Sequence, residues 1–367
     1  MMRSTIVGSL VVVIVMNTIT SVFGFSAPVR LDAFVNQECD AGLTQCIEAI
    51  ASSSVRIADL IARAPIDGLL GGAAHSAENS SGDKVKQLDV VSNEILKTAL
   101  LDLDGVSLIV SEEEVDPIIT SHATLSGKLI VAFDPLDGSS NIDCAVATGT
   151  IVGIYRQPAG GPLVSESCDM TLDMAREQVL QRGTDLVAAL YVMYSSSTEM
   201  MLCTGVGKGT HGFSLDPSTK SFVMTRNSVK LPTRGQYYSL NEGRSADWPE
   251  GLRTYIDDVK NGRGRSGKRY SSRYICSLVA DFHRTILYGG WAGNPRSHLR
   301  LLYEAAPLAM LSAEAGGDGS DGKQPLLDIR PTHHHQKTPV FLGSREDIVE
   351  LLSYGDIQQL GTIKYEA

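Results

Sequence analysis

The stretch FDPLDGSS, residues 133–140, follows directly on an apolar run that is typical of a buried strand. It places two carboxylates, Asp134 and Asp137, at the end of that strand. Gly138 and Ser139 then offer backbone N–H groups and a hydroxyl at a helix start, where a phosphate can bind. The stretch therefore predicts a strand that ends in a combined metal and phosphate site.

A second acidic stretch, SEEEV at residues 111–115, follows the apolar run at 106–110. Three adjacent carboxylates repel one another, and a strand end is a poorly solvated place for them. Further acidic residues, Asp83, Asp89 and Glu304, stand near the ends of other apolar elements. Single acidic residues often serve as turns or caps. The whole set predicts a cation, because burying unpaired charge is costly. With no His or Cys nearby, these oxygen ligands favour Mg²⁺, with Mn²⁺ as the alternative.

The composition supports a large enzyme-like core and argues against nucleic-acid binding. The chain has 367 residues, 43% of them hydrophobic, and a formal net charge of −10. A chain of this length can bury a sizeable core in two lobes. Proteins that bind nucleic acids usually present a basic face, which this balance does not favour. An anionic substrate would have to meet local cations, either arginine and lysine side chains or metal ions.

The first residues read as a targeting segment. A basic start and a short apolar stretch predict a signal peptide over residues 1–24, too short to span a bilayer comfortably. GFSAP, at 24–28, resembles the cleavage site of bipartite plastid presequences in algae with complex plastids. Residues 25–38 are then a short transit or linker segment. The resemblance implies the plastid (chloroplast stroma), with secretion as the alternative, and no membrane span in the mature chain.

Strand and helix patterns alternate along the remaining chain. We predict an N-terminal lobe over residues 39–229, which carries the metal ligands and a regulatory region, and a C-terminal substrate-binding lobe over residues 230–355. Because strands and helices are mixed in both lobes, the fold class is α/β (α+β layered), with stacked helix and sheet layers. The expected helices are 43–64, one behind Asp83, 247–260, 277–287 and 299–315; the expected strands are 106–110, 129–133, 150–155, 237–240 and 340–343, with a hairpin at 213–224.

Several motifs in one order resemble those of the fructose-1,6-bisphosphatase family, over most of residues 43–345. They are LDVVSN (88–93), SEE (111–113), FDPLDGSSNID (133–143), SLNEG (239–243), RY (273–274), DFHRT (281–285) and LRLLYE (299–304). The resemblance implies a two-lobed sugar phosphatase fold, usually a homotetramer. It also implies metal-assisted hydrolysis of the 1-phosphate of fructose 1,6-bisphosphate, which gives fructose 6-phosphate and phosphate.

The same resemblance implies a role for each matching residue. Asp89 would help to activate the attacking water, Asp83 would support it from a loop, and Glu113 would act both as a ligand and in catalysis. Gly138 and Ser139 would hold the reacting 1-phosphate. The implied metal ligands are Glu112, Glu113, Asp134, Asp137, Glu304 and the carbonyl oxygen of Leu136.

The distal phosphate pocket departs from the family pattern. Arg244 stands where the family has Tyr or Asn, Asn294 where it often has Tyr, and His298 where it has Lys, and the loop 291–298 looks short. Arg244 either supplies a replacement cation or points to solvent. These changes leave sedoheptulose 1,7-bisphosphate open as a substrate, alone or in a dual enzyme; a silent sugar-phosphate sensor is the alternative from another class. The expected substrate-binding residues are Gly138, Ser139, Asn241, Arg244, Arg273, Tyr274 and His298.

Regulation is expected to be weak. Lys128 and Arg156 fall on positions that contact AMP in regulated members, but Leu129 replaces the usual Tyr, so we expect little AMP inhibition. The loop that carries paired cysteines in similar plastid forms has only Cys168 here, which disfavours a redox switch on it. Cys39, Cys46 and Cys203 remain candidate disulfide partners of Cys168. The triple histidine at 333–335 is interpreted as a loop and not as a metal site.

Overall fold

Strand β3, Leu129–Asp137, lies inside the first sheet and carries the FDPLD motif. The computed structural model describes residues 28–71, 86–124, 126–158 and 169–359. All nine residues of β3 are buried. Val131 and Phe133 face one hydrophobic core, whereas Ile130 and Ala132 face another on the opposite side of the sheet. The continuous apolar run at this place is therefore the signature of a strand covered on both faces.

The first sheet has eight strands in the order β2-β1-β3-β4-β5-β6-β7-β8. Strands β1 and β3 are parallel, and the other neighbours are antiparallel. The remaining strands of this sheet are β1 Val106–Ser111, β2 Ile118–Ile119, β4 Thr148–Arg156, β5 Leu186–Tyr194, β6 Thr198–Cys203, β7 His211–Asp216 and β8 Ser221–Arg226.

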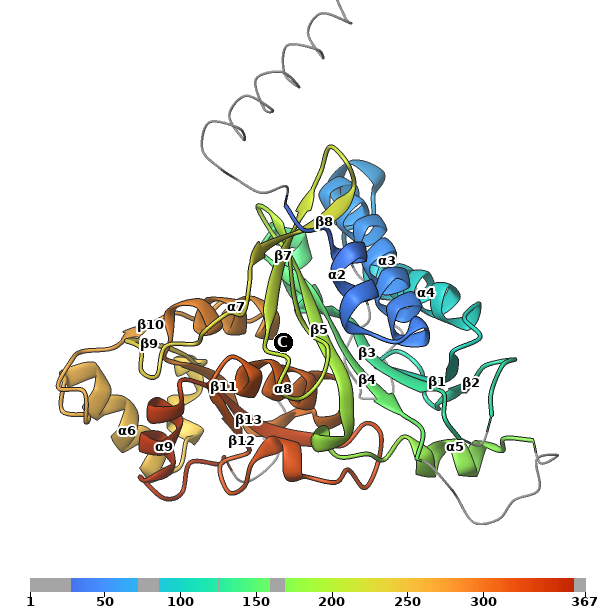
Figure 1. Ribbon diagram of the computed structural model, residues 1–367. Coiled ribbons are helices and arrows are strands. Elements are labelled where there is room, and N and C mark those ends of the chain that lie inside the picture. Colours follow the sequence, from blue (N-terminus) through green and yellow to red (C-terminus); the bar gives the residue numbers. More distant parts are fainter. Residues whose placement is uncertain (1–27, 72–85, 125, 159–168, 360–367) are drawn as a thin grey trace, which may run out of the picture.

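Helices cover both faces of this sheet and separate it from a second one (Figure 1). On one face lie α2 Leu31–Glu38, α3 Ala41–Asp67 and α4 Gln87–Leu101; on the other lie α7 Leu278–Tyr288 and α8 Ala306–Glu314. The second sheet has the order β10-β9-β11-β13-β12. Its strands are β9 Tyr237–Ser239, β10 Ser271–Ser272, β11 Trp291–Arg300, β12 Asp318–Ser320 and β13 Lys337–Gly343.

Two further helices, α6 Glu250–Asn261 and α9 Arg345–Leu352, pack on the outer side of the second sheet (Figure 1). The fully buried Trp291 is the centre of this packing, because its indole N–H donates to Tyr255 Oη at 3.1 Å. A short helix, α5 Leu172–Gln178, lies beyond the edge strand β2 of the first sheet. Helices and sheets thus alternate in layers, which confirms the predicted fold class.

Some predicted elements differ from the structure. The helix expected over 299–315 begins at Leu301, because Leu299 and Arg300 pair with strand β13; its first turn, Leu301–Ala305, is a π-helical turn (the π-turn) that leads into α8. The segment interpreted as a short loop at 291–298 belongs to β11, which contains an irregularity in its pairing between Asn294 and Leu299. Strands β5 and β6 had no counterpart in the sequence prediction.

The N-terminal boundary also differs. Helix α2 lies within the segment assigned to transit or linker, yet Leu31 and Val35 are buried in the core beneath α3, so this helix is part of the folded lobe. The predicted signal peptide and Asp83 lie outside the described residues. Among the residues that the structure describes, no helix combines the length and apolar character that a membrane span requires.

Candidate metal and phosphate site

The two acidic motifs meet because β1 and β3 are parallel. Ser111 pairs with Phe133, the last residue before the FDPLD carboxylates, and the N–H of Glu112 donates to the carbonyl of Phe133 at 3.2 Å. Since parallel strands end at the same edge of a sheet, Glu112 and Asp134 emerge side by side. Both side chains are buried.

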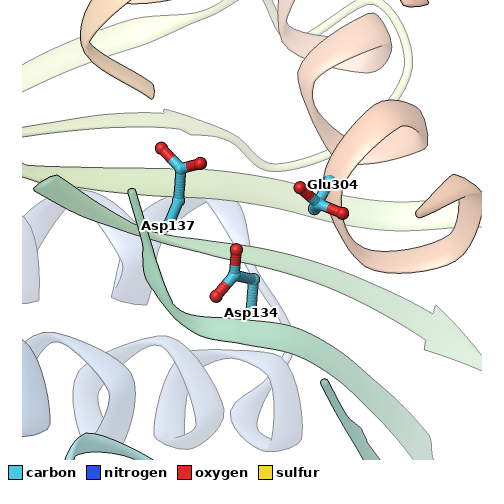
Figure 2. Close-up of side chains that lie close together, drawn as sticks. All are labelled: Asp134, Asp137 and Glu304. Atoms are coloured by element: carbon cyan, nitrogen blue, oxygen red, sulfur yellow. The ribbon is translucent and has the colours of Figure 1, made fainter. Parts of the chain in front are cut away.

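A third segment brings Glu304 to the same place. Asp134, Asp137 and Glu304 each offer a carboxylate oxygen, and these oxygens lie within 4.8 Å of one another (Figure 2). Glu304 comes from the π-turn Leu301–Ala305 between β11 and α8. All three residues are buried. The geometry therefore gathers, from three positions in the sequence, the core of the predicted metal set.

The close packing of these carboxylates has a clear electrostatic signature. Burial, reinforced by the charge of Glu112, raises the pKa of Asp134 well above its ordinary value. Burial likewise raises the pKa values of Asp137 and Glu304, although the Arg300 guanidinium opposes the effect at Glu304. Hydrogen bonds alone do not remove this excess of negative charge, whereas a divalent cation would. Hard oxygen ligands without sulfur or imidazole fit Mg²⁺ or Mn²⁺.

Arg300 is a member of the site that the sequence reasoning missed. Its guanidinium lies 2.5 Å from Glu112 and 3.8 Å from Glu304, and its backbone N–H donates to Glu304 at 2.5 Å. The side chain is 6% exposed. The sequence signal that could have identified Arg300 is its charge, because its neighbours at the start of LRLLYE, residues 299–304, are apolar. Arg300 thus offsets part of the negative charge of the buried carboxylates.

Asp137 is held by the start of helix α7. Its carboxylate accepts hydrogen bonds from the Ser277 hydroxyl at 3.0 Å and from the N–H groups of Val279 and Leu278 at 2.9 and 3.3 Å. Helix N-termini stabilise negative charge. The approach is close because β4 has glycine at position 149, where a Cβ atom would lie 2.7 Å from the side chain of Val279.

Gly138 turns the chain from this strand into the turn Ser139–Cys144. It has φ of 73°, which favours glycine, and a Cβ atom here would lie 2.8 Å from the Cβ of Ser277. Ser139 also reaches the start of α4, where it bonds to Asp89. Burial raises the pKa of Asp89 to about 7, while hydrogen bonds from Lys86 N–H and from Ser139 oppose the rise. A carboxyl group of this kind can accept or release a proton near neutral pH.

The three glutamates of SEEEV have different surroundings. Glu112 joins the buried cluster, and Glu113 follows it, half-buried, with its N–H bonded to the Ser111 hydroxyl. Glu114 turns away to helix α4, where its carboxylate accepts hydrogen bonds from Asn93 and Lys97 at 2.9 and 2.8 Å. The structure therefore supplies Glu114 with protein partners of its own.

The expected distal-phosphate residues belong to the second sheet and to the segments that follow its strands. Strands β9 and β10 are parallel, so Asn241 and Tyr274, which follow them, lie towards the same edge of the sheet, whereas His298 lies within β11. Arg273 is exposed, and its guanidinium lies 5.5 Å above the ring of Tyr237. Arg244 is half-buried in the turn Glu242–Asp247.

The expected AMP contacts are already engaged within the chain. Arg156 Nη2 lies 2.6 Å from Asp40, and the other carboxylate oxygen of Asp40 accepts the N–H of Leu43 at the start of α3. Lys128 donates to the carbonyl of His122 at 2.5 Å. The Asp40 carboxylate thus bonds both to the Arg156 guanidinium and to the N-terminus of α3.

The candidate redox partners are free thiols in the described part of the chain. Cys39, Cys46 and Cys203 form no disulfide, and Cys168 lies outside the described residues. Burial raises the pKa of Cys46 and of Cys203 to about 12, so neither thiol is readily ionised at neutral pH.

The layered fold, the buried carboxylates and the adjoining turn define a metal-dependent phosphatase. Two family models match the chain: fructose-1-6-bisphosphatase N-terminal domain over residues 31–227, and the C-terminal domain over residues 231–356. The chain therefore belongs to the fructose-1,6-bisphosphatase family, which confirms the resemblance of its motifs.

Named relatives and solved structures agree with this assignment. The chain is 45% identical to fructose-1,6-bisphosphatase 1, chloroplastic, of Arabidopsis thaliana over 328 residues, which cover 86% of this chain and 77% of that protein. It is also 45% identical to the chloroplastic enzyme of Pisum sativum, over 86% of this chain and 79% of that protein. The Leishmania major fructose-1,6-bisphosphatase in holo form superimposes with a TM-score of 0.83 at 36% identity, covering 90% of this chain and all of that one.

Proposed function

We propose that this chain hydrolyses the 1-phosphate of fructose 1,6-bisphosphate to fructose 6-phosphate and phosphate, with Mg²⁺, or alternatively Mn²⁺, as its metal. The observation that carries the proposal is the meeting of Asp134, Asp137 and Glu304 within 4.8 Å, next to the Gly138 turn. The similar chloroplastic proteins and the Leishmania major structure bear the name of this activity.

The carboxylates and a backbone carbonyl would hold the cations. When bound, divalent ions withdraw charge from a phosphoryl group and lower the pKa of water. The proposed ligands are Glu112, Glu113, Asp134, Asp137, Glu304 and the Leu136 carbonyl. In this arrangement Arg300 neutralises part of the remaining carboxylate charge, since it contacts Glu112 and Glu304.

The groups around this cluster would bind phosphate and move a proton. Asp89, with its pKa raised to about 7 by burial, would take a proton from the attacking water. Gly138 and Ser139 would present N–H and hydroxyl donors to the 1-phosphate, and Asp83 would support Asp89. Asn241, Arg244, Tyr274 and His298 would contact the distal phosphate, together with Arg273 from a neighbouring subunit.

Sedoheptulose 1,7-bisphosphate is the second candidate substrate. Arg244, Asn294 and His298 are half-buried residues near the expected distal pocket, and each departs from the residue usual in the family. A pocket with altered cations could accept the longer sugar. A silent sensor fits less well, because the intact buried carboxylates carry an electrostatic cost that a binding module would not need.

The deciding experiment is phosphate release by the chain started at Phe25, with Mg²⁺ and with a chelator. Fructose 1,6-bisphosphate, sedoheptulose 1,7-bisphosphate and an inositol monophosphate are compared side by side. We expect chelator-sensitive release from the first and none from the third. A preference for the second substrate would transfer the assignment to it, whereas binding of bisphosphate without turnover on any substrate would support the sensor.

Assembly and location are part of the proposal. We expect a homotetramer in which Arg273 reaches the neighbouring site, as its exposed position allows. Light scattering gives the subunit number, and mixing an Arg273→Ala chain with an Asp134→Asn chain should restore some active sites if Arg273 acts across subunits. For the plastid, a fluorescent fusion of residues 1–38 should reach the stroma; a signal confined to the secretory route would contradict it.

A further inference from the structure

A half-buried histidine, His335, joins the two segments that carry the proposed metal ligands. His335 lies in the loop between Asp328 and strand β13. Its Nδ1 lies 2.8 Å from the hydroxyl of Tyr303, and its Nε2 lies 3.0 Å from the carbonyl oxygen of Glu114. Tyr303 directly precedes Glu304, and Glu114 directly follows Glu113. One imidazole ring therefore spans the space between the SEEEV loop and the π-turn.

The chemistry of the partners fixes the direction of both hydrogen bonds. A carbonyl oxygen can only accept, so the proton of the neutral ring must be on Nε2. Nδ1 is then the acceptor, and the Tyr303 hydroxyl donates to it. Each nitrogen of His335 has a partner that suits it, and Tyr303 is completely buried. The connection is therefore a specific, oriented bridge in a site where an unmatched polar group would be costly.

A second histidine repeats the contact one residue further along the loop. The Nε2 of His334 lies 3.0 Å from the carbonyl oxygen of Val115, and this ring is 2% exposed. The rings of His334 and His335 lie 4.3 Å apart, centre to centre. Because both nitrogens of His335 are engaged by protein groups, the triple histidine does not present a set of free lone pairs to a metal.

The SEEEV loop is thus held from two sides. Its backbone carbonyls at Glu114 and Val115 accept from the two histidines, while the Glu114 side chain accepts from Asn93 and Lys97 on helix α4. Without these contacts the loop would be free to move away from the buried negative charge of the cluster. The contacts oppose that movement without themselves entering the cluster.

We propose that His335, assisted by His334, is a positioning residue that sets the spacing between the Glu112–Glu113 ligands and Glu304, and thereby the metal affinity. The inference rests on the proposed metal site. Groups that orient metal ligands from behind typically change metal affinity or activity by about 10–100-fold when they are removed. His335 differs from such a group in acting on the backbone and on a neighbouring tyrosine, so we expect an effect near the lower end of that range.

The test compares two tyrosine-to-phenylalanine variants. Tyr303→Phe removes the hydroxyl that donates to His335. Tyr191→Phe is the matched control, because its hydroxyl makes the same type of contact with Nδ1 of the buried His283, at 2.9 Å, but links strand β5 to helix α7 and not the SEEEV loop to the π-turn. His335→Phe is the stronger variant, since it removes both bonds of the bridge.

Two measurements are made on the full-length folded proteins without substrate. The first is Mn²⁺ affinity, from the electron paramagnetic resonance signal of free Mn²⁺; the second is amide hydrogen exchange of residues 111–116 in the metal-free state. We expect Tyr303→Phe and His335→Phe to bind Mn²⁺ about 10-fold more weakly and to exchange faster in this loop. Tyr191→Phe should leave both quantities unchanged, even where it lowers thermal stability.

The outcomes separate this inference from the proposed function. If the unaltered protein binds no Mn²⁺, the metal site itself is refuted and the positioning role falls with it. If the protein binds Mn²⁺ and Tyr303→Phe and His335→Phe bind it equally well, the metal site stands and the positioning role is refuted. Equal weakening in Tyr191→Phe would also refute it, because the effect would then reflect general stability.

Discussion

Replacing Asp134 by asparagine should stabilise the metal-free protein while it abolishes metal-dependent hydrolysis. Asp134 is 3% exposed and lies among buried carboxylates, so burial and repulsion raise its pKa far above the ordinary 3.8. The folded metal-free protein therefore disfavours the ionised form of this carboxyl group. Each unit by which the folded state raises the pKa of a carboxyl group costs about 1.36 kcal/mol of stability at neutral pH.

Asparagine has the same shape and carries no charge. Its side-chain oxygen can still accept the N–H of Leu136, which lies 2.9 Å from Asp134 Oδ1. The free energy of unfolding in chelator at pH 7 should therefore rise, by about 1.36 kcal/mol for each unit by which the folded state raises the pKa of Asp134. Because the folded-state pKa is raised, the penalty is absent below pH 3.8 and grows with pH up to the folded-state value, so the gain should shrink towards pH 4.

Urea unfolding followed by tryptophan fluorescence measures this free energy, since the two tryptophans, Trp248 and Trp291, are both buried. Saturating Mg²⁺ should stabilise the unaltered protein, by about 2.7 kcal/mol at a hundred times the dissociation constant. Saturating Mg²⁺ should leave the free energy of unfolding of the Asp134→Asn variant unchanged. Asp173→Asn, on a carboxylate that is 93% exposed, is the control and should change neither stability nor hydrolysis. The reasoning is refuted if Asp134→Asn is less stable in chelator at pH 7, or keeps Mg²⁺-dependent hydrolysis.

Three further changes test other parts of the structure. Gly138→Ala should lower turnover strongly in a folded protein, because its Cβ would lie 2.8 Å from Ser277 at a positive φ; normal turnover would contradict the turn's role. AMP should leave hydrolysis unchanged, because Asp40 already occupies Arg156, and strong inhibition in an AMP titration would count against this. Arg234→Met should cost about 3–5 kcal/mol in urea unfolding, because it strands two buried carboxylates, yet leave Mn²⁺ affinity unaltered.

The sequence was sufficient to predict the parts of the site that are local. Asp134 and Asp137 stand directly after an apolar run, and Glu112 stands directly after another, so a strand followed by acidic residues could be recognised at each place. The mixing of strand and helix patterns in both lobes also predicted the layered fold class. Glu112 lies beside Asp134, however, because β1 pairs with β3 in parallel. This pairing cannot be predicted from the residues of either strand alone.

The parts that escaped prediction depend on contacts between distant segments. Arg300 looked like one residue of a helix, but pairing with β13 holds it in a strand and directs its guanidinium to Glu112. Strands β5 and β6 pair with each other and with their neighbours in the sheet, and their pattern of buried residues on both sides gives no alternation that marks a strand.

The SEEEV stretch shows why a metal site of this kind needs support from residues that never touch metal. Like charges buried together push their segments apart, and the push is strongest before any cation is present. Glu112 and Arg300 reduce part of that force by pairing. Hydrogen bonds to the surrounding protein must oppose the remaining repulsion. Glu114 makes such bonds to α4 through its side chain and to His335 through its backbone carbonyl. The third glutamate thus contributes by binding the protein and not the ion, so the acidic run is longer than the ligand set requires.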